Sequence, residues 1–347
     1  MSKIVHIGKL KVGGHNPVRI KGMLKTPARK LSRLIREGLG LELRGAEAIR
    51  IAFKEQSETR ALRALKKELS VPLVADIHFH PALALAALDA GVDGIRLNPL
   101  NITKKDTLKE IVRQAKQRKV SIRIGVNSGG FKEHTSSDGR FARAMVKKVS
   151  DYIKLFEDQQ FSDIMVSLKA SQVSTTIAAN RLFSQKFQYP LHLGVTASGP
   201  FLQGVIKSSL GIGILLSEGI GSIIRVSLTG ASCDEIDVAK AILQFLGLRW
   251  FFPEIISCPT CGRCEVNLTR IVDDFQKQLR KVSLPGAFKK VALMGCVVNG
   301  PGEAAQADIG VAFGKNKGAI FRRGKVIGYT DPDNTIKDVI RKIRDAV

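Results

Sequence analysis

Residues 73–98, LVADIHFHPALALAALDAGVDGIRLN, contain the repeating unit that decides the fold. Leu73–Ile77 is a short apolar run, Pro81–Ala90 is rich in helix-forming residues, and Gly94–Asn98 is a second apolar run. This pattern predicts a strand, a helix and a second strand in succession. Charged or polar side chains stand at the carboxyl end of both predicted strands, namely Asp76, His78, Arg96 and Asn98.

The same unit recurs from residue 18 to about residue 248. The candidate strands are Val18–Leu24, Ala48–Phe53, Leu73–Ile77, Gly94–Asn98, Ser121–Asn127, Ile164–Lys169, Leu191–Thr196 and Ile223–Leu228. Helical patterns lie between them, for example Thr59–Leu69, Pro81–Ala90, Lys105–Lys119 and Arg140–Gln159. Eight strands alternating with helices over about 230 residues predict an α/β fold of the (β/α)8 TIM-barrel type. A doubly wound open sheet is the main structural alternative.

Polar side chains stand at or after the end of nearly every predicted strand, which is the face of a barrel that hosts active sites. Any one of them is compatible with an ordinary strand-end polar group, but cations recurring in apolar strands are costly to bury unpaired. Because the guanidinium fork matches phosphate oxygens, the pattern predicts a phosphorylated ligand. The residues are Arg50, Asp76, His78, Arg96, Asn98, Arg123, Asn127, Lys169, His192, Thr196, Arg225 and Ser227.

An aromatic break, residues 248–253 (LRWFFP), marks the expected domain boundary. We therefore predict a barrel over residues 1–248 and a small α+β domain over residues 249–347. The elements expected in the second domain are a helix at Leu268–Lys281, strands at Lys290–Val298 and Asp308–Phe313, a hairpin at Ala319–Tyr329 and a helix at Asn334–Ala346.

Four of the five cysteines lie in this second domain. Cys258, Cys261 and Cys264 form a C-x2-C-x2-C run, and Cys296 follows in GCVVNGPGE, residues 295–303. Such clustering favours a metal site over disulfides, and the spacing alone is compatible with zinc or an iron–sulfur cluster. Glu303 favours the cluster, because a carboxylate is a poor ligand for a structural thiolate zinc site.

Composition sets limits on the function. The hydrophobic content is 44% and the charged content 25%, and no apolar stretch reaches the roughly 20 residues that span a bilayer. The N-terminus lacks a signal-peptide pattern, so we expect a cytoplasmic protein that does not enter a membrane. The net charge of +24 indicates a basic surface or an anionic partner. Three Tyr, one Trp and no helix-turn-helix pattern argue against nucleic acid as that partner.

Several runs resemble the IspG/GcpE family over nearly the whole chain. They are VADIHF (74–79), RLNP (96–99), IRIGVN (122–127), VSLKAS (166–171), LHLGVT (191–196), LLSEGIG (215–221), RVSL (225–228), CPTC (258–261) and GCVVNGPGE (295–303). The resemblance implies reductive ring opening and dehydroxylation of 2-C-methyl-D-erythritol 2,4-cyclodiphosphate to 4-hydroxy-3-methylbut-2-enyl diphosphate, a step of isoprenoid biosynthesis. It also implies a [4Fe–4S] cluster, flavodoxin or ferredoxin as electron donor, and a homodimer with the cluster domain of one subunit over the partner's barrel.

The resemblance also implies roles for particular residues. Cys258, Cys261, Cys296 and Glu303 match the cluster ligands, with Glu303 as the catalytic, displaceable one; Cys264 matches no ligand position. Positions that clamp the diphosphate match Arg50, Arg96, Arg123, Lys169 and Arg225. Polar positions of the same pocket match Asp76, His78, Asn98, Asn127, Thr196 and Ser227.

Three departures from the family pattern lie at the expected barrel mouth. Ala197 replaces a family glutamate that is expected to donate a proton or orient the substrate. The loop at the end of the first strand reads KGMLKT (21–26), with two added lysines, and Leu100 replaces a glycine of a turn. They leave open a divergent reductase for another phosphorylated substrate. Two further hypotheses compete with these enzymes: a non-enzymatic iron–sulfur protein that binds nucleic acid, and a zinc-stapled barrel hydrolase.

Overall fold

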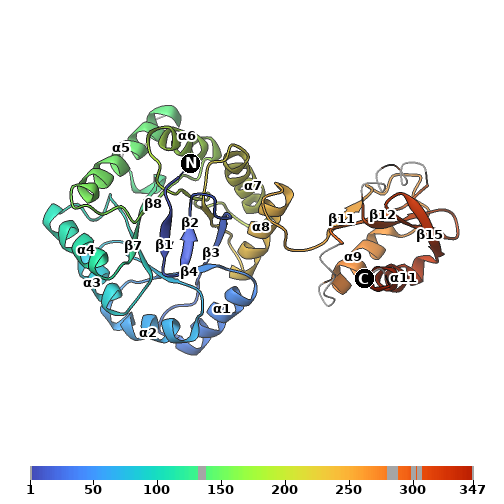
Figure 1. Cartoon of the computed structure of the whole chain (residues 1–347), viewed down its shortest axis with the longest axis horizontal. Helices are drawn as coiled ribbons and strands as arrows, with labels where there is room; N and C mark the ends of the chain where they lie inside the picture. The colour runs from blue at the N-terminus through green and yellow to red at the C-terminus, as the bar shows by residue number, and fades with distance from the viewer. Residues whose placement is uncertain (1, 132–137, 280–287, 298–301, 303–306, 346–347) are drawn as a thin grey trace. The chain divides into compact units, whose positions relative to one another are not determined.

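A computed structural model describes residues 2–131, 138–279, 288–297, 302 and 307–345. The chain divides into two compact units, Met1–Trp250 and Phe251–Val347 (Figure 1). Each unit has its own sheet and its own hydrophobic core. The two units are therefore described separately.

The first unit is a closed barrel of parallel strands. They are β3 (Arg19–Met23), β4 (Ala48–Ala52), β5 (Leu73–Asp76), β6 (Gly94–Leu97), β7 (Ser121–Asn127), β8 (Ile164–Lys169), β9 (His192–Leu193) and β10 (Ile223–Ile224). Strands β3 to β8 pair in sequence, β10 pairs with both β9 and β3, and a parallel bridge from Val166 to Leu191 closes the ring. The predicted TIM-type barrel is confirmed, because an open sheet would leave two unpaired edges.

Helices surround this ring (Figure 1). They are α1 (Leu31–Leu43), η1 (Gln56–Glu58), α2 (Thr59–Glu68), α3 (Pro81–Asp89), α4 (Lys105–Gln117), η2 (Ser128–Gly130), α5 (Asp138–Glu157), α6 (Val173–Lys186), α7 (Phe201–Ser217) and α8 (Ser232–Phe245). In α4 the buried residues are Leu108, Ile111, Val112 and Ala115, the three-and-four spacing of one helix face. The four barrel helices predicted by range begin and end within two residues of those observed.

An N-terminal hairpin, which the sequence pattern did not predict, closes the amino end of the barrel. Its strands β1 (Val5–Ile7) and β2 (Leu10–Val12) pair in antiparallel fashion. Val5, Ile7 and Val12 form a buried cluster with side chains from the amino ends of the strands, namely Val74, Met165 and Ile223. Because apolar side chains fill this end, the polar residues at the carboxyl ends face the remaining opening.

The second unit is a five-stranded mixed sheet with helices. Its elements are β11 (Glu254–Ser257), α9 (Leu268–Leu279), β12 (Lys290–Met294), β13 (Ile309–Phe313), β14 (Gly318–Arg322), β15 (Lys325–Thr330), η3 (Pro332–Asn334) and α11 (Thr335–Arg344). β11, β12 and β13 run parallel, whereas β13, β14 and β15 form an antiparallel meander. Phe275, Phe313 and Ile343 lie in its core. The α+β prediction is confirmed, although β11 was not predicted.

Three predicted strands are shorter than expected by four residues each, and several others by one or two. β12 ends at Met294, β9 covers His192–Leu193 and β10 covers Ile223–Ile224. After β9 the chain leaves the ladder at Gly194, whose added Cβ would lie 2.5 Å from the Arg225 carbonyl oxygen. Among the described residues, no helix combines the length and apolar character that crossing a bilayer requires.

Candidate active site

The polar residues predicted at the barrel mouth share the inner face of the ring. Alternate residues of a strand point to the same side of the sheet. Residues that lie opposite one another on neighbouring strands also point to the same side. Asp76 is opposite Arg96, and Arg96 is opposite Arg123. A Cβ on Gly125 would lie 2.6 Å from Arg96 Nε and 3.1 Å from Arg123 Nη1. Glycine at this position therefore leaves room for both guanidinium groups inside the barrel.

Asp76 is the acidic centre of this cluster. Its carboxylate lies 3.3 Å from Arg96 Nη1, 3.7 Å from Arg50 Nε and 3.4 Å from His78 Nε2. Burial alone would raise the pKa of Asp76, but attraction to Arg50 and the hydrogen bond with His78 hold it well below its usual range. Asp76 is therefore ionised at neutral pH and pairs with more than one cation.

The inner cations exceed the carboxylates that face them, and several of their nitrogens are buried without an acceptor. In the part of the chain that the structure describes, the buried nitrogens lacking a hydrogen-bond partner are Lys21 Nζ, Arg96 Nε, Arg123 Nε and Nη2, both His192 ring nitrogens, and Arg225 Nε. Burial, followed by repulsion from Arg123, lowers the pKa of Lys21 and of Lys169 well below the usual range. Such donors are costly to leave unpaired, so the barrel interior is suited to a polyanionic ligand.

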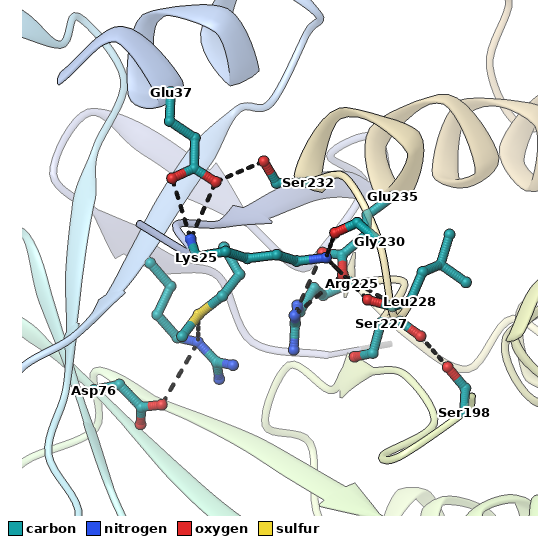
Figure 2. A network of polar contacts seen from close by, with 12 residues as sticks. Lys25, Glu37, Asp76, Ser198, Arg225, Ser227, Leu228, Gly230, Ser232 and Glu235 are labelled. Atoms are coloured by element: carbon teal, nitrogen blue, oxygen red, sulfur yellow. Dashed lines mark hydrogen bonds and ion pairs between the residues drawn. The ribbon is translucent and has the colours of Figure 1, made fainter. Parts of the chain in front are cut away.

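A second acidic group lies beside the last strand of the barrel. Glu235, in the first turn of α8, is 1% exposed and lies 3.3 Å from Arg225 Nη2 and 2.9 Å from Lys25 Nζ (Figure 2). Burial, followed by repulsion from Arg50, lowers the pKa of Arg225 to about 10, while Glu235 opposes the shift. Arg225 is thus held from one side, and its Nε has no partner among the described residues.

The other predicted pocket residues also lie at the carboxyl ends of the strands. Asn98 accepts a hydrogen bond from the Leu100 amide at 3.2 Å, and the Thr196 amide donates to the Ala170 carbonyl at 3.1 Å. Ser198 donates to the Ser227 carbonyl, which ties together the loops after β9 and β10. The structure therefore brings together at one end the whole predicted set: Arg50, Asp76, His78, Arg96, Asn98, Arg123, Asn127, Lys169, Thr196, Arg225 and Ser227.

Sequence reasoning did not include Lys21, Lys25 and Glu235 in the candidate site. The sequence contained an indication for Lys21: it is a charged residue inside the first barrel strand, at an inner position two residues before Met23. Lys25 was noted only as an added charge at the barrel mouth, and Glu235 was not noted. Their contact left no signal, because they lie 210 positions apart and meet only across the closed ring. Their contact joins the loop after β3 to the start of α8.

Ala197 stands in the loop after β9 with a left-handed backbone, φ 49°. Its methyl group supplies no acid at the position where the resemblance leads us to expect a glutamate. The two carboxylates of the described inner cluster, Asp76 and Glu235, are both paired with cations. Neither is suited to replace a missing proton donor.

The cysteine motif of the second unit lies at the carboxyl ends of two neighbouring parallel strands. β11 pairs with β12 so that Ser257 is opposite Leu293, and Cys258 and Cys296 follow these strands closely. The Gly295 amide donates to Cys258 Sγ at 3.3 Å. The Arg263 backbone amide lowers the pKa of the exposed Cys261 thiol. Hydrogen bonds from backbone amides stabilise a thiolate, and they are one factor that tunes the potential of an iron–sulfur cluster held by thiolates.

Cys264 has different surroundings. Its thiol donates to the Val266 carbonyl at 3.2 Å, and a Cβ on Gly295 would lie 2.3 Å from Cys264 Sγ. Cys233 is half-buried in the first turn of α8, in the other unit. Within the described ranges, no three His, Cys, Asp or Glu side chains are grouped to hold a metal ion. Glu303 lies outside the described residues.

A barrel with a cationic mouth, followed by a small α+β unit with a cysteine motif, defines a class of two-domain barrel proteins. The chain matches the family model described as the GcpE TIM-barrel domain over residues 2–240 and the GcpE protein C-terminal domain over residues 254–345. This chain therefore belongs to the GcpE family.

Curated relatives agree with this assignment. A protein of Thermodesulfovibrio yellowstonii is 46% identical over 98% of this chain and 97% of its own length. One of Exiguobacterium sibiricum is 42% identical over 99% of this chain and 92% of its own length. Both are named 4-hydroxy-3-methylbut-2-en-1-yl diphosphate synthase (flavodoxin). Among solved structures, Xanthomonas albilineans dihydropteroate synthase matches 70% of this chain and 98% of its own, with 15% identity and a TM-score of 0.53, which supports the barrel fold alone.

Proposed function

We propose that this chain is a 4-hydroxy-3-methylbut-2-en-1-yl diphosphate synthase. The reaction is the two-electron reductive ring opening and dehydroxylation of 2-C-methyl-D-erythritol 2,4-cyclodiphosphate. The observation that carries the proposal is the group of buried nitrogens inside the barrel, of which Lys21 Nζ, Arg123 Nη2 and Arg225 Nε lack a partner among the described residues. A cyclic diphosphate offers the oxygens that these donors lack.

The barrel residues would bind and orient the diphosphate. Arg50, Arg96, Arg123, Lys169 and Arg225 clamp its oxygens in this proposal. Asp76 holds Arg50 and Arg96 in position, because ion pairs from two strands converge on its carboxylate. With the apolar cluster of the hairpin closing the amino end, the substrate enters and leaves by the carboxyl face. His78, Asn98, Asn127, Thr196 and Ser227 complete the polar wall.

The second unit would hold a [4Fe–4S] cluster. Cys258, Cys261 and Cys296 are its thiolate ligands in this proposal, and Glu303 is the fourth, displaceable and catalytic ligand. Support comes from the hydrogen bond to Cys258 Sγ and the lowered pKa of the Cys261 thiol. When bound, such a cluster supplies electrons and a Lewis-acidic iron to the leaving hydroxyl. Cys264 is left out, because its thiol is engaged by the Val266 carbonyl.

Partners and location follow from the same proposal. Flavodoxin, named for the relatives, or ferredoxin would deliver the electrons. We propose a cytoplasmic location, since thiols stay reduced in that compartment. We also propose a homodimer, which the family resemblance implies. Sedimentation equilibrium of the full chain tests the dimer, and a monomer at all accessible concentrations would contradict it.

The experiment that tests the function is a single-turnover assay. Anaerobically purified, dithionite-reduced protein is mixed with the cyclodiphosphate, and the product is read by mass spectrometry. Formation of 4-hydroxy-3-methylbut-2-enyl diphosphate supports the proposal. An intact, reduced cluster with no conversion contradicts it.

Ala197 favours a second candidate function, a reductase for a different phosphorylated alcohol. Loss of a proton-transfer group costs about 10²–10⁴-fold in rate unless another donor replaces it. The second arm of the assay therefore offers other phosphorylated alcohols to the reduced protein. Conversion of one of these, with none of the cyclodiphosphate, would select the second candidate.

A further inference from the structure

Lys25 occupies the loop after β3 and reaches across the barrel rim to the loop after β10. Its ammonium group donates hydrogen bonds to the Leu228 carbonyl at 2.9 Å and to the Gly230 carbonyl at 2.8 Å, and it forms an ion pair with Glu235, whose Oε1 lies 2.9 Å away (Figure 2). These three contacts hold the charged end of a side chain that is 31% exposed. Lys25 therefore links the loop after β3 to the loop after β10 and to α8.

The other end of the Lys25 loop is also fixed. Glu37 of α1 accepts hydrogen bonds from the Lys25 amide at 3.1 Å and from the Thr26 amide at 2.8 Å. The same carboxylate accepts the Ser232 hydroxyl at 2.7 Å, at the first residue of α8. Figure 2 shows both ends of Lys25 tied in this way. Glu37 thus links the backbone at residue 25 to the start of α8.

Glu235 is the group for which two cations compete. It is 1% exposed, so its charge requires compensation within the protein. Its Oε1 accepts the Leu228 amide at 2.9 Å and lies 2.9 Å from Lys25 Nζ, whereas Arg225 Nη2 lies 3.5 Å from Oε1 and 3.3 Å from Oε2. Charge-assisted N–H···O bonds are usually about 2.7–2.9 Å long. Lys25 Nζ is therefore the closer cation, whereas the hydrogen bonds that Arg225 Nη2 donates to the two carboxylate oxygens are long.

We propose that Lys25 is a positioning residue: by compensating Glu235, it keeps the Arg225 guanidinium available to the phosphoryl group of the substrate. Without Lys25, Arg225 is the remaining cation beside a buried carboxylate, and the two long hydrogen bonds that its Nη2 donates to Glu235 shorten as the guanidinium moves toward it. Its Nε and Nη groups then no longer face the anion. The inference rests on the proposed function, since it assigns Arg225 to the diphosphate.

The test measures anion binding and turnover separately. Inorganic pyrophosphate binding to the full chain is followed by titration calorimetry in a buffer free of phosphate, for the wild type, Lys25→Met, Lys25→Arg and Lys25→Met/Glu235→Gln. We expect Lys25→Met to weaken pyrophosphate binding by roughly tenfold, the loss of one weak charge-assisted contact. Lys25→Arg keeps the cation and restores most of the affinity. Lys30→Met, which removes an exposed charge from the same loop, is the matched control.

The double variant decides the mechanism. If Arg225 is sequestered by Glu235, then Glu235→Gln in the Lys25→Met background restores binding to within about threefold of the wild type, because a neutral amide does not trap the guanidinium. In turnover, Lys25→Met then raises KM for the cyclodiphosphate while kcat is largely kept. Equal weakening in the single and double variants, or no weakening in Lys25→Met, overturns the inference. Absence of pyrophosphate binding by the wild type overturns the anion site itself, and the inference with it.

Discussion

Replacing Lys21 tests whether a charge buried inside the barrel lowers the free energy of unfolding while it strengthens anion binding. Its side chain is 1% exposed, and its Nζ has no acceptor within the described residues. Methionine has a similar volume and no charge, so Lys21→Met removes the ammonium without leaving a large cavity. Replacing buried charged groups by apolar side chains of similar volume stabilises some proteins by about 1–4 kcal/mol, as found for buried ion pairs. We expect the free energy of unfolding of the ligand-free chain to rise by that amount at neutral pH.

The pH dependence gives the same experiment a second readout. Burial and Arg123 lower the pKa of Lys21 in the folded chain below the unfolded value of about 10.4. Between these two values the unfolded chain binds more protons, so the free energy of unfolding of the wild type rises with pH in that window. Below the folded pKa the full cost of the charge is present. Lys21→Met lacks this contribution, so its advantage over the wild type shrinks as the pH approaches 10.

Denaturant unfolding at several pH values, in buffers without phosphate, measures both effects, with the exposed Lys67→Met as control. Calorimetry with pyrophosphate supplies the functional half, because removing one donor to the anion should weaken binding by about tenfold or more. A Lys21→Met chain that is less stable than the wild type, or that binds pyrophosphate equally well, would refute the reasoning.

Three further outcomes are expected. Ala197→Glu should raise single-turnover conversion of the cyclodiphosphate by about 10²-fold or more, because it returns an acid to the mouth; unchanged conversion would mean that another donor already suffices. Glu303→Ala should nearly abolish turnover whereas Cys264→Ala keeps most of it, as measured with reduced protein of known iron content; the reverse order would refute the ligand assignment. Asp76→Asn should destabilise the barrel by about 3–5 kcal/mol, because it leaves buried cations unpaired. Since the folded pKa of Asp76 is depressed, the stability that Asp76 contributes is present above about pH 4 and is lost as the pH falls through the folded value, which acid unfolding of both chains checks.

Local sequence patterns were sufficient to predict the barrel. Strands and helices each have a characteristic spacing of apolar residues, which can be read from the sequence. Charged residues within apolar strands, such as Arg96 and Arg123, are easily recognised. Because parallel strands end at one face, a list of strand ends is already a list of neighbours. The prediction failed where the period was absent, as in the three-residue strands of the N-terminal hairpin, Val5–Ile7 and Leu10–Val12.

The chemistry of the second unit was predicted only in outline. The spacing of Cys258, Cys261 and Cys264 fits any ligand subset, because spacing does not say where a sulfur points. The surroundings of the thiols differ through tertiary contacts: the Gly295 amide donates to Cys258 Sγ, whereas Cys264 donates to the Val266 carbonyl.

By itself the sequence determined the alternation of strands and helices, the cations at the strand ends, and the motifs that relate the chain to its family. Only the tertiary structure decided which charges meet. Lys25 and Glu235 lie 2.9 Å apart although 210 positions separate them, and Lys21 is buried among cations with Asp76 as the acidic group that acts on it. A local pattern determines on which face of its strand or helix a side chain lies. Which other side chain it contacts there depends on closure of the ring, because closure brings distant parts of the chain together.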